Sequence, residues 1–135
     1  MTVSISKIRG IAPAHAKTLK DHDLGNSAKY LAATKTAEKR RELASALGVS
    51  EQMVLEHANR CDLARIDGIG RVFSNLLETA GVDTVKELAV RVPQNLFEKL
   101  AETNVGKRYA QRNPTLKEVK GWVAQAKKLP KVLQY

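Results

Sequence analysis

Two glycines, Gly68 and Gly70 in the stretch IDGIG, are the residues of this sequence best suited to bind an anion. Glycine adopts backbone angles that other residues avoid, and without a Cβ it leaves its amide N–H uncovered. The apolar spacing that follows predicts a helix beginning near Arg71. The first amides of a helix lack intrahelical partners and lie at the positive end of its dipole. The backbone from Gly68 to Val72 is therefore predicted to bind a phosphate group.

Neighbouring side chains would complete this predicted site. Arg71, and Arg65 on the approach, are placed to contact an adjacent phosphate, whereas Ile69 is expected to point inward and hold the turn against the core. Asp67 would repel a phosphate unless it caps a helix. Such a site touches no base edge, so its binding would not depend on nucleotide sequence. Alternatively, the turn serves only to join two helices, and the sequence leaves both interpretations open.

Most of the excess positive charge lies near the carboxy terminus. The chain has 135 residues and a formal net charge of +9. Residues 105–135 contain eight Lys and Arg and a single Glu, a net charge of +7, so the other 104 residues carry only +2. The candidate phosphate contacts in this segment are Lys107, Arg108, Arg112, Lys127 and Lys128. Clustered cations suit a polyanionic partner because binding releases counterions. A solvated helix face that keeps the protein soluble is the alternative.

An internal repeat divides the chain. The segment IRGIAPAHAKTL from Ile8 aligns with IDGIGRVFSNLL from Ile66, at an offset of 58 residues. Farther along, VLEHANRCDL corresponds loosely to VKGWVAQAKKL. We therefore predict two copies of one helical unit, residues 1–64 and residues 65–135.

The first copy of the glycine turn is the weaker candidate for phosphate binding. Gly10, flanked by Arg9, matches the first glycine of the other copy. Ala12 replaces the second glycine and adds a methyl group where the ligand would approach, and Pro13 removes an N–H. The positive charge of Arg9 compensates in part.

Local signals predict helices along most of the chain. Thr84 and Thr115 each begin a Thr-x-x-Glu sequence, the capping-box pattern of a helix start. Further signals for helix starts and ends are Gly48 before Ser50, Gly81 before Asp83, Pro93 and Pro130. Only TVSIS at the amino end alternates like a strand, and it is too short to found a sheet. The prediction is an all-α fold.

Both copies resemble the helix-hairpin-helix motif, in the stretches ISKIRGIAPAHAKTLKDHDL and LARIDGIGRVFSNLLETAGVDTVKEL. The doubled arrangement is similar to an uncharacterised bacterial domain-of-unknown-function family, family 4332, built from paired helix-hairpin-helix units. This resemblance implies two tandem helix-hairpin-helix repeats packed into a compact bundle, and it implies no activity. In the wider superfamily, hairpin carbonyls also hold a monovalent cation, which would fall here at Ile66 to Gly70.

Other reactive residues give weaker patterns. His57 and Cys61 are four residues apart, and His15 and His22 lie elsewhere, so a metal site is conceivable, but no paired ligand motif supports one. Ser74 lacks the sequence context of a nucleophile. We therefore expect neither a metal, nor another cofactor, nor enzyme activity.

The composition excludes a membrane span, since no apolar run approaches the roughly 18 residues that one requires. A single cysteine and an amino end without a secretory pattern lead us to expect a cytoplasmic protein.

The expected function is non-catalytic, sequence-independent nucleic-acid binding, with duplex DNA favoured. The alternative is a protein-interaction or assembly module, such as a homodimer, without nucleic-acid binding. A third interpretation, an accessory subunit of a nucleic-acid enzyme, combines both roles.

Overall fold

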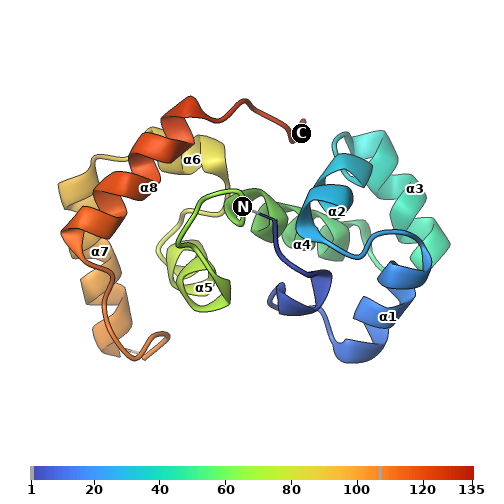
Figure 1. Cartoon of the computed structure of the whole chain (residues 1–135), viewed down its shortest axis with the longest axis horizontal. Helices are drawn as coiled ribbons and strands as arrows, with labels where there is room; N and C mark the ends of the chain where they lie inside the picture. The colour runs from blue at the N-terminus through green and yellow to red at the C-terminus, as the bar shows by residue number, and fades with distance from the viewer. Residues whose placement is uncertain (1, 107) are drawn as a thin grey trace. The chain divides into compact units, whose positions relative to one another are not determined.

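The computed structural model describes residues 2–106 and 108–135, which form eight α-helices and one short 3-10 helix (Figure 1). In chain order the elements are η1 (Ile5–Lys7), α1 (Pro13–Asp21), α2 (Ser27–Ala33), α3 (Ala37–Leu47), α4 (Glu51–Leu63), α5 (Arg71–Thr79), α6 (Val85–Ala89), α7 (Pro93–Gly106) and α8 (Leu116–Lys128). Within these residues there is no β-sheet, and the alternating segment at the amino end contributes only a bridge between Ser4 and Asn26. The all-α prediction is confirmed.

The chain divides into two compact units. Unit 1 comprises Met1–Arg65 and Lys131–Tyr135, and unit 2 comprises Ile66–Pro130. The predicted boundary lay between residues 64 and 65. The sequence repeat places the last five residues in the second unit, but in the structure they belong to unit 1, because Leu133 is buried in its core and Val132 packs against that core.

Unit 1 is built around α4, against which both α2 and α3 pack, while α1 lies beside η1 (Figure 1). Its core is formed by apolar side chains from all of these elements, with Ile5, Leu19, Tyr30 and Val54 fully enclosed. The carboxy-terminal segment is attached to this unit by backbone hydrogen bonding, since the Gln134 amide donates to the Lys35 carbonyl at 2.8 Å.

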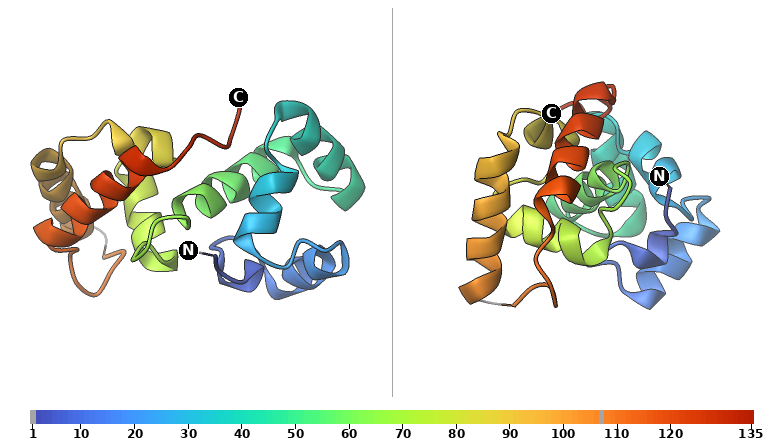
Figure 2. Two further views of the ribbon diagram at one scale, coloured as in Figure 1. Left: turned by 45° about the horizontal axis from the view of Figure 1, so that its top comes forward. Right: turned by 60° about the vertical axis from the view of Figure 1, so that its left-hand side comes forward.

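Unit 2 is organised by α8, which packs against both α6 and α7, while α5 packs on α7. Figure 2 shows α7 and α8 side by side. Its core consists of large apolar side chains that are almost completely enclosed, among them Leu76, Leu77, Leu88, Leu100 and Val119. Burial of this apolar stripe, more than local propensity, stabilises helices of this length.

The predicted helix signals are largely confirmed. The Gly48 backbone has a φ of +69° at the end of α3, and Ser50 caps α4 by accepting from the Met53 amide. Thr115 and Glu118 form the complete capping box at the start of α8. Helix α7 begins at Pro93, and α8 ends two residues before Pro130, as predicted.

The start of α6 keeps only half of its predicted capping box. The Thr84 hydroxyl accepts from the Glu87 amide at 3.2 Å, whereas the Glu87 carboxylate is hydrogen-bonded to the side chain of Asp83. Burial, followed by repulsion from Glu87 and Glu78, raises the pKa of Asp83 to about 6. The capping threonine therefore lies next to a carboxyl group whose charged form is disfavoured by burial and by its acidic neighbours.

Replacing Asp83 with asparagine is expected to stabilise the protein at pH 7 and to have little effect near pH 4. The folded-state pKa lies above the ordinary value, so the stabilisation by the protonated group is present at low pH and is lost as the pH rises through about 6. Because Asp83 is partly exposed to solvent, we expect a gain of only about 1 kcal/mol at neutral pH. Urea denaturation of both proteins at the two pH values measures it, and an equal difference at both would contradict the assignment.

Candidate functional site

Residues Ile66–Ile69, called glycine turn 2 below, form a tight turn directly before α5. The Ile69 amide donates to the Ile66 carbonyl at 3.3 Å, and Gly68 has a φ of +92°. A positive φ at the third position is the mark of a type II turn and explains the glycine there. Both isoleucines are buried, as expected for Ile69, while Gly68 is exposed.

Helix α5 begins at Gly70 without a side-chain cap from any residue that the structure describes. The Ser74 amide makes the first hydrogen bond of the helix, to the Gly70 carbonyl. The amides of Arg71 to Phe73 therefore precede the intrahelical bonding pattern. Gly70, Arg71 and Val72 are all exposed.

The two α-helices that follow glycine turns both begin without a side-chain cap. Side chains cap α2, α3, α4, α6 and α8, whereas among the described residues none caps α1 or α5. Gly70 has a φ of −93°, which any residue can adopt, and a Cβ placed there would meet no atom within 4 Å. Neither strain nor crowding therefore requires glycine at this position.

Two side chains of helix α8 contact glycine turn 2. The Gln125 side chain accepts from the Asp67 amide at 3.0 Å and donates to the Asp67 carbonyl at 3.4 Å. Three residues earlier, the Trp122 indole lies against Gly68. Neither Trp122 nor Gln125 was predicted from the sequence as part of the site, although both lie in the segment that aligned loosely with the end of the first repeat.

Residues Ile8–Ile11, called glycine turn 1, have the same geometry. The Ile11 amide donates to the Ile8 carbonyl at 3.3 Å, and Gly10 has a φ of +90°. Helix α4 supports this turn through His57 and Arg60, whose guanidinium donates to the Arg9 carbonyl and closes on Gly10. In the alignment of the two repeats, His57 and Arg60 correspond to Trp122 and Gln125. In each unit the same pair of positions thus contacts the turn.

A buried polar cluster lies behind glycine turn 1. The His57 ring is within 5.8 Å of the His15 ring and 6.3 Å of the Tyr30 ring, measured between centroids. Burial, with Arg60 as the next largest cause, lowers the pKa of His57 to about 4, so this imidazole is neutral at pH 7. Neutral His57 avoids placing a second charge beside Arg60.

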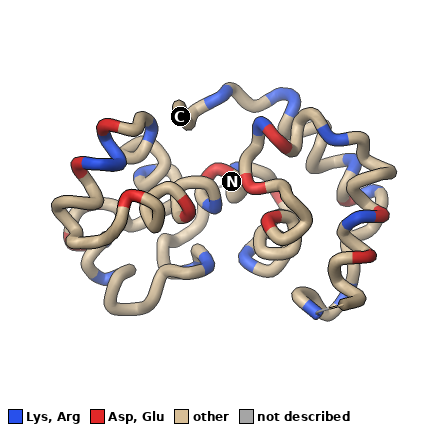
Figure 3. The backbone as a smooth tube through the Cα atoms, turned by 180° about the vertical axis from the view of Figure 1, so that it is seen from behind, with Lys and Arg blue, Asp and Glu red and all other residues tan. Residues whose placement is uncertain are grey.

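Several predicted cations lie exposed on their elements. Basic residues are spread over both units among acidic ones (Figure 3). The predicted cations that are exposed are Arg9, Arg71, Arg108, Arg112, Lys127 and Lys128. Lys107 lies outside the residues that the structure describes.

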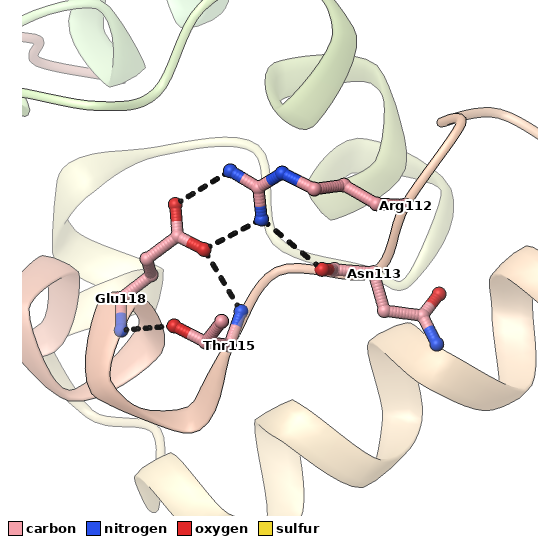
Figure 4. Close-up of polar contacts among 4 residues, drawn as sticks. All are labelled: Arg112, Asn113, Thr115 and Glu118. Carbon is pink, nitrogen blue, oxygen red and sulfur yellow. Dashed lines mark hydrogen bonds and ion pairs between the residues drawn. The ribbon is translucent and has the colours of Figure 1, made fainter.

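Two predicted phosphate contacts are already paired with carboxylates. Arg65 lies in unit 1 and donates to Asp62 at 3.0 Å, and only 16% of its side chain is exposed. Arg112 forms two hydrogen bonds with Glu118, at 2.7 and 3.1 Å (Figure 4). Its guanidinium also lies over the Phe73 ring. Hydrogen bonding from Arg112, then from the Thr115 amide, lowers the pKa of Glu118 to about 2. Both arginines have structural roles, which does not support their assignment as phosphate contacts.

The remaining reactive groups are enclosed. Burial raises the pKa of the Cys61 thiol to about 12, and Ser74 is 6% exposed. Within residues 2–106 and 108–135, no group of three or more His, Cys, Asp or Glu is arranged to hold a metal ion. At the predicted monovalent-cation position, the Ile66 and Asp67 carbonyls already accept hydrogen bonds from within unit 2.

None of the described helices combines the length and apolar character that a bilayer crossing requires.

Comparison with known proteins matches the chain to a protein family. No curated protein and no solved structure is significantly similar to the chain. A family described as a domain of unknown function (DUF4332) matches residues 9–129, which include glycine turn 2, all of glycine turn 1 except Ile8, and all helices from α1 to α8. The chain therefore belongs to the DUF4332 family.

Proposed function

We propose that this protein binds the sugar-phosphate backbone of duplex DNA, without catalysis and without dependence on sequence, in the manner of a helix-hairpin-helix protein. The contact is made by the amides that follow Gly70, assisted by nearby cations. The observation that carries the proposal is the exposed, uncapped start of α5, in a chain whose other helix starts are mostly capped by side chains. Open amides at a helix start favour a phosphate oxygen.

Arg71 and Lys128 are the cations best placed to support this contact. Arg71 is the first residue of α5 and is exposed. Lys128 follows Gln125 by three residues, so it lies on the side of α8 that contacts glycine turn 2. Lys120 is also exposed, but at five residues from Gln125 it lies on a different side of the helix.

Duplex binding is expected to weaken steeply with salt. If about four phosphates are neutralised, the logarithm of the association constant falls with the logarithm of salt concentration at a slope of about −3.5, with a dissociation constant of roughly micromolar or weaker. Replacing Lys128 with glutamine is expected to reduce the slope by about 0.9, because one counterion fewer is released. Fluorescence anisotropy with a labelled duplex over a salt series measures both quantities.

The matched control is Lys120→Gln, which removes the same charge from the same helix and is expected to leave the slope nearly unchanged. Equal losses from the two variants would mean that net charge alone attracts the duplex. An affinity independent of salt would exclude the electrostatic mechanism altogether.

Protein interaction is the second candidate function, favoured by exposed valines at the junction of α6 and α7. Val90 and Val92 are 77% and 57% exposed. Their replacement by serine is expected to leave duplex binding unchanged. A protein that fails to bind any duplex and yet self-associates through these valines, as judged by light scattering, would favour this function instead.

A further inference from the structure

Trp122 is the single tryptophan of the chain, and the core of unit 2 fixes its position. The side chain is on α8 and only 3% of the residue is exposed. Its ring packs against Phe73 of α5, with the ring centroids 5.4 Å apart. The indole is therefore held between α8 and the helix that begins at the candidate phosphate site.

The indole nitrogen of Trp122 lies beside glycine turn 2. Nε1 is 3.1 Å from the position that a Cβ would take on Gly68, and no described residue accepts a hydrogen bond from it. Although the residue is buried, Nε1 is not one of the fully buried polar atoms that lack a partner, so this N–H reaches the surface, where Trp side chains usually find a hydrogen-bond partner. Since Gly68 has no side chain and is exposed, its surface leaves room beside this donor for an external acceptor.

The equivalent residue in unit 1 is hydrogen-bonded to its own turn. His57 Nε2 is 3.4 Å from the corresponding Cβ position on Gly10, and His57 is hydrogen-bonded to the Gly10 backbone. The two turns share their backbone geometry, yet the ring nitrogen nearest the turn is hydrogen-bonded to the backbone only in unit 1, where Nδ1 on the far side of the His57 ring has no partner. This difference agrees with the weaker rating of glycine turn 1 from its sequence.

We infer that the indole N–H of Trp122 is a direct donor to a phosphodiester oxygen bound at glycine turn 2. The inference rests on the proposed function and adds to it one side chain and a reason for Gly68. A side chain at Gly68 would strain the positive φ and would cover the indole nitrogen. Trp122 thus acts as a neutral donor beside the amides that follow Gly70.

Nuclear magnetic resonance can observe this donor directly, because one tryptophan gives one indole N–H signal. Uniformly ¹⁵N-labelled protein is titrated with a short blunt-ended DNA duplex, and separately with inorganic phosphate, against sodium chloride at matched ionic strength. The indole signal is expected to shift on duplex addition with the same dissociation constant as the amide signals of Gly70 to Val72. Sodium chloride alone is expected to leave it in place.

Substitution of Trp122 tests whether it contributes to duplex binding as an uncharged hydrogen-bond donor, because such a donor affects the affinity but not its salt dependence. Trp122→Phe keeps an aromatic ring against Phe73 and is expected to weaken duplex binding about tenfold, the loss of one hydrogen bond to a charged acceptor. The salt slope should not change, because no counterion-releasing charge is removed. Trp122→His restores a ring N–H, as at the equivalent position of unit 1, and is expected to recover part of the affinity.

The outcomes distinguish this inference from the proposed function. If the amides of Gly70 to Val72 respond to duplex and the indole signal does not, Trp122 is only a core residue and the inference is overturned, while the proposed function stands. If neither responds and no duplex is retained, the proposed function fails as well. The titration uses the unaltered protein, so the result does not depend on whether the Trp122 variants fold.

Discussion

Replacing Gly70 with aspartate is expected to stabilise the protein and to weaken duplex binding by about tenfold or more. The Gly70 backbone already has the extended angles of a capping residue, and a Cβ there meets no neighbour. An aspartate at this position can accept from the amide of Val72 or Phe73, which adds about 0.5 kcal/mol of stability. The same bond occupies an amide offered to phosphate, and the carboxylate repels the ligand.

Two further variants isolate the cause of the lost affinity. Gly70→Asn can cap the helix without adding charge, so it is expected to weaken binding less than aspartate but still measurably. Ala12→Asp adds the same charge at the start of α1, which is also without a side-chain cap in the described structure. It is expected to stabilise unit 1 while affecting duplex affinity much less.

Thermal unfolding and anisotropy titrations at one salt concentration measure the two effects. A Gly70→Asp protein that is more stable and binds duplex normally would show that the α5 amides do not contact phosphate. Equal losses from Gly70→Asp and Ala12→Asp would mean either that both turns bind or that net charge alone acts. Gly70→Asn and Ala12→Asn distinguish these two explanations, because neither variant alters the charge. Loss of affinity in both asparagine variants would mean that both turns bind, and normal affinity in both would mean that net charge alone acts.

Replacing Arg40 with alanine is expected to lower the free energy of unfolding by about 3 kcal/mol. The residue is 6% exposed, and its guanidinium donates to the Thr34 carbonyl at 2.8 Å and to the Gln134 carbonyl at 2.7 Å. It also lies over the Tyr135 ring. Alanine would leave both carbonyls without this donor and would release the carboxy-terminal segment from unit 1.

Arg41→Ala is the control for this prediction. The side chain of Arg41 is 66% exposed and its ion pair with Glu51 is long, at 3.7 Å, so its loss is expected to cost less than about 0.5 kcal/mol. Urea denaturation followed by circular dichroism compares the two variants. If the two losses were equal, the carboxy-terminal segment would contribute little to the stability of unit 1.

The predicted phosphate-binding arginines show what the sequence does not determine. Their positive charge is evident from the sequence, but their partners in the structure are not. Arg112 is paired with Glu118, six residues away across a loop, and no local pattern indicates that pair. Arg65 and Asp62 are spaced three residues apart, a separation that brings helical side chains together, so this pairing could have been anticipated.

The sequence by itself determined the all-α fold, the complete cap at Thr115, the helix end at Gly48 and the positive φ at Gly68, but the special backbone angle expected at Gly70 was wrong, since its φ is −93°. These features depend on backbone sterics and on hydrogen bonds between residues a few positions apart, so residue type and spacing are enough to specify them. Only the tertiary structure decided that α8 places Trp122 and Gln125 under glycine turn 2 and that the last five residues pack in unit 1. Such contacts join residues more than fifty positions apart, and they depend on how buried surfaces fit together, which spacing along the chain does not encode.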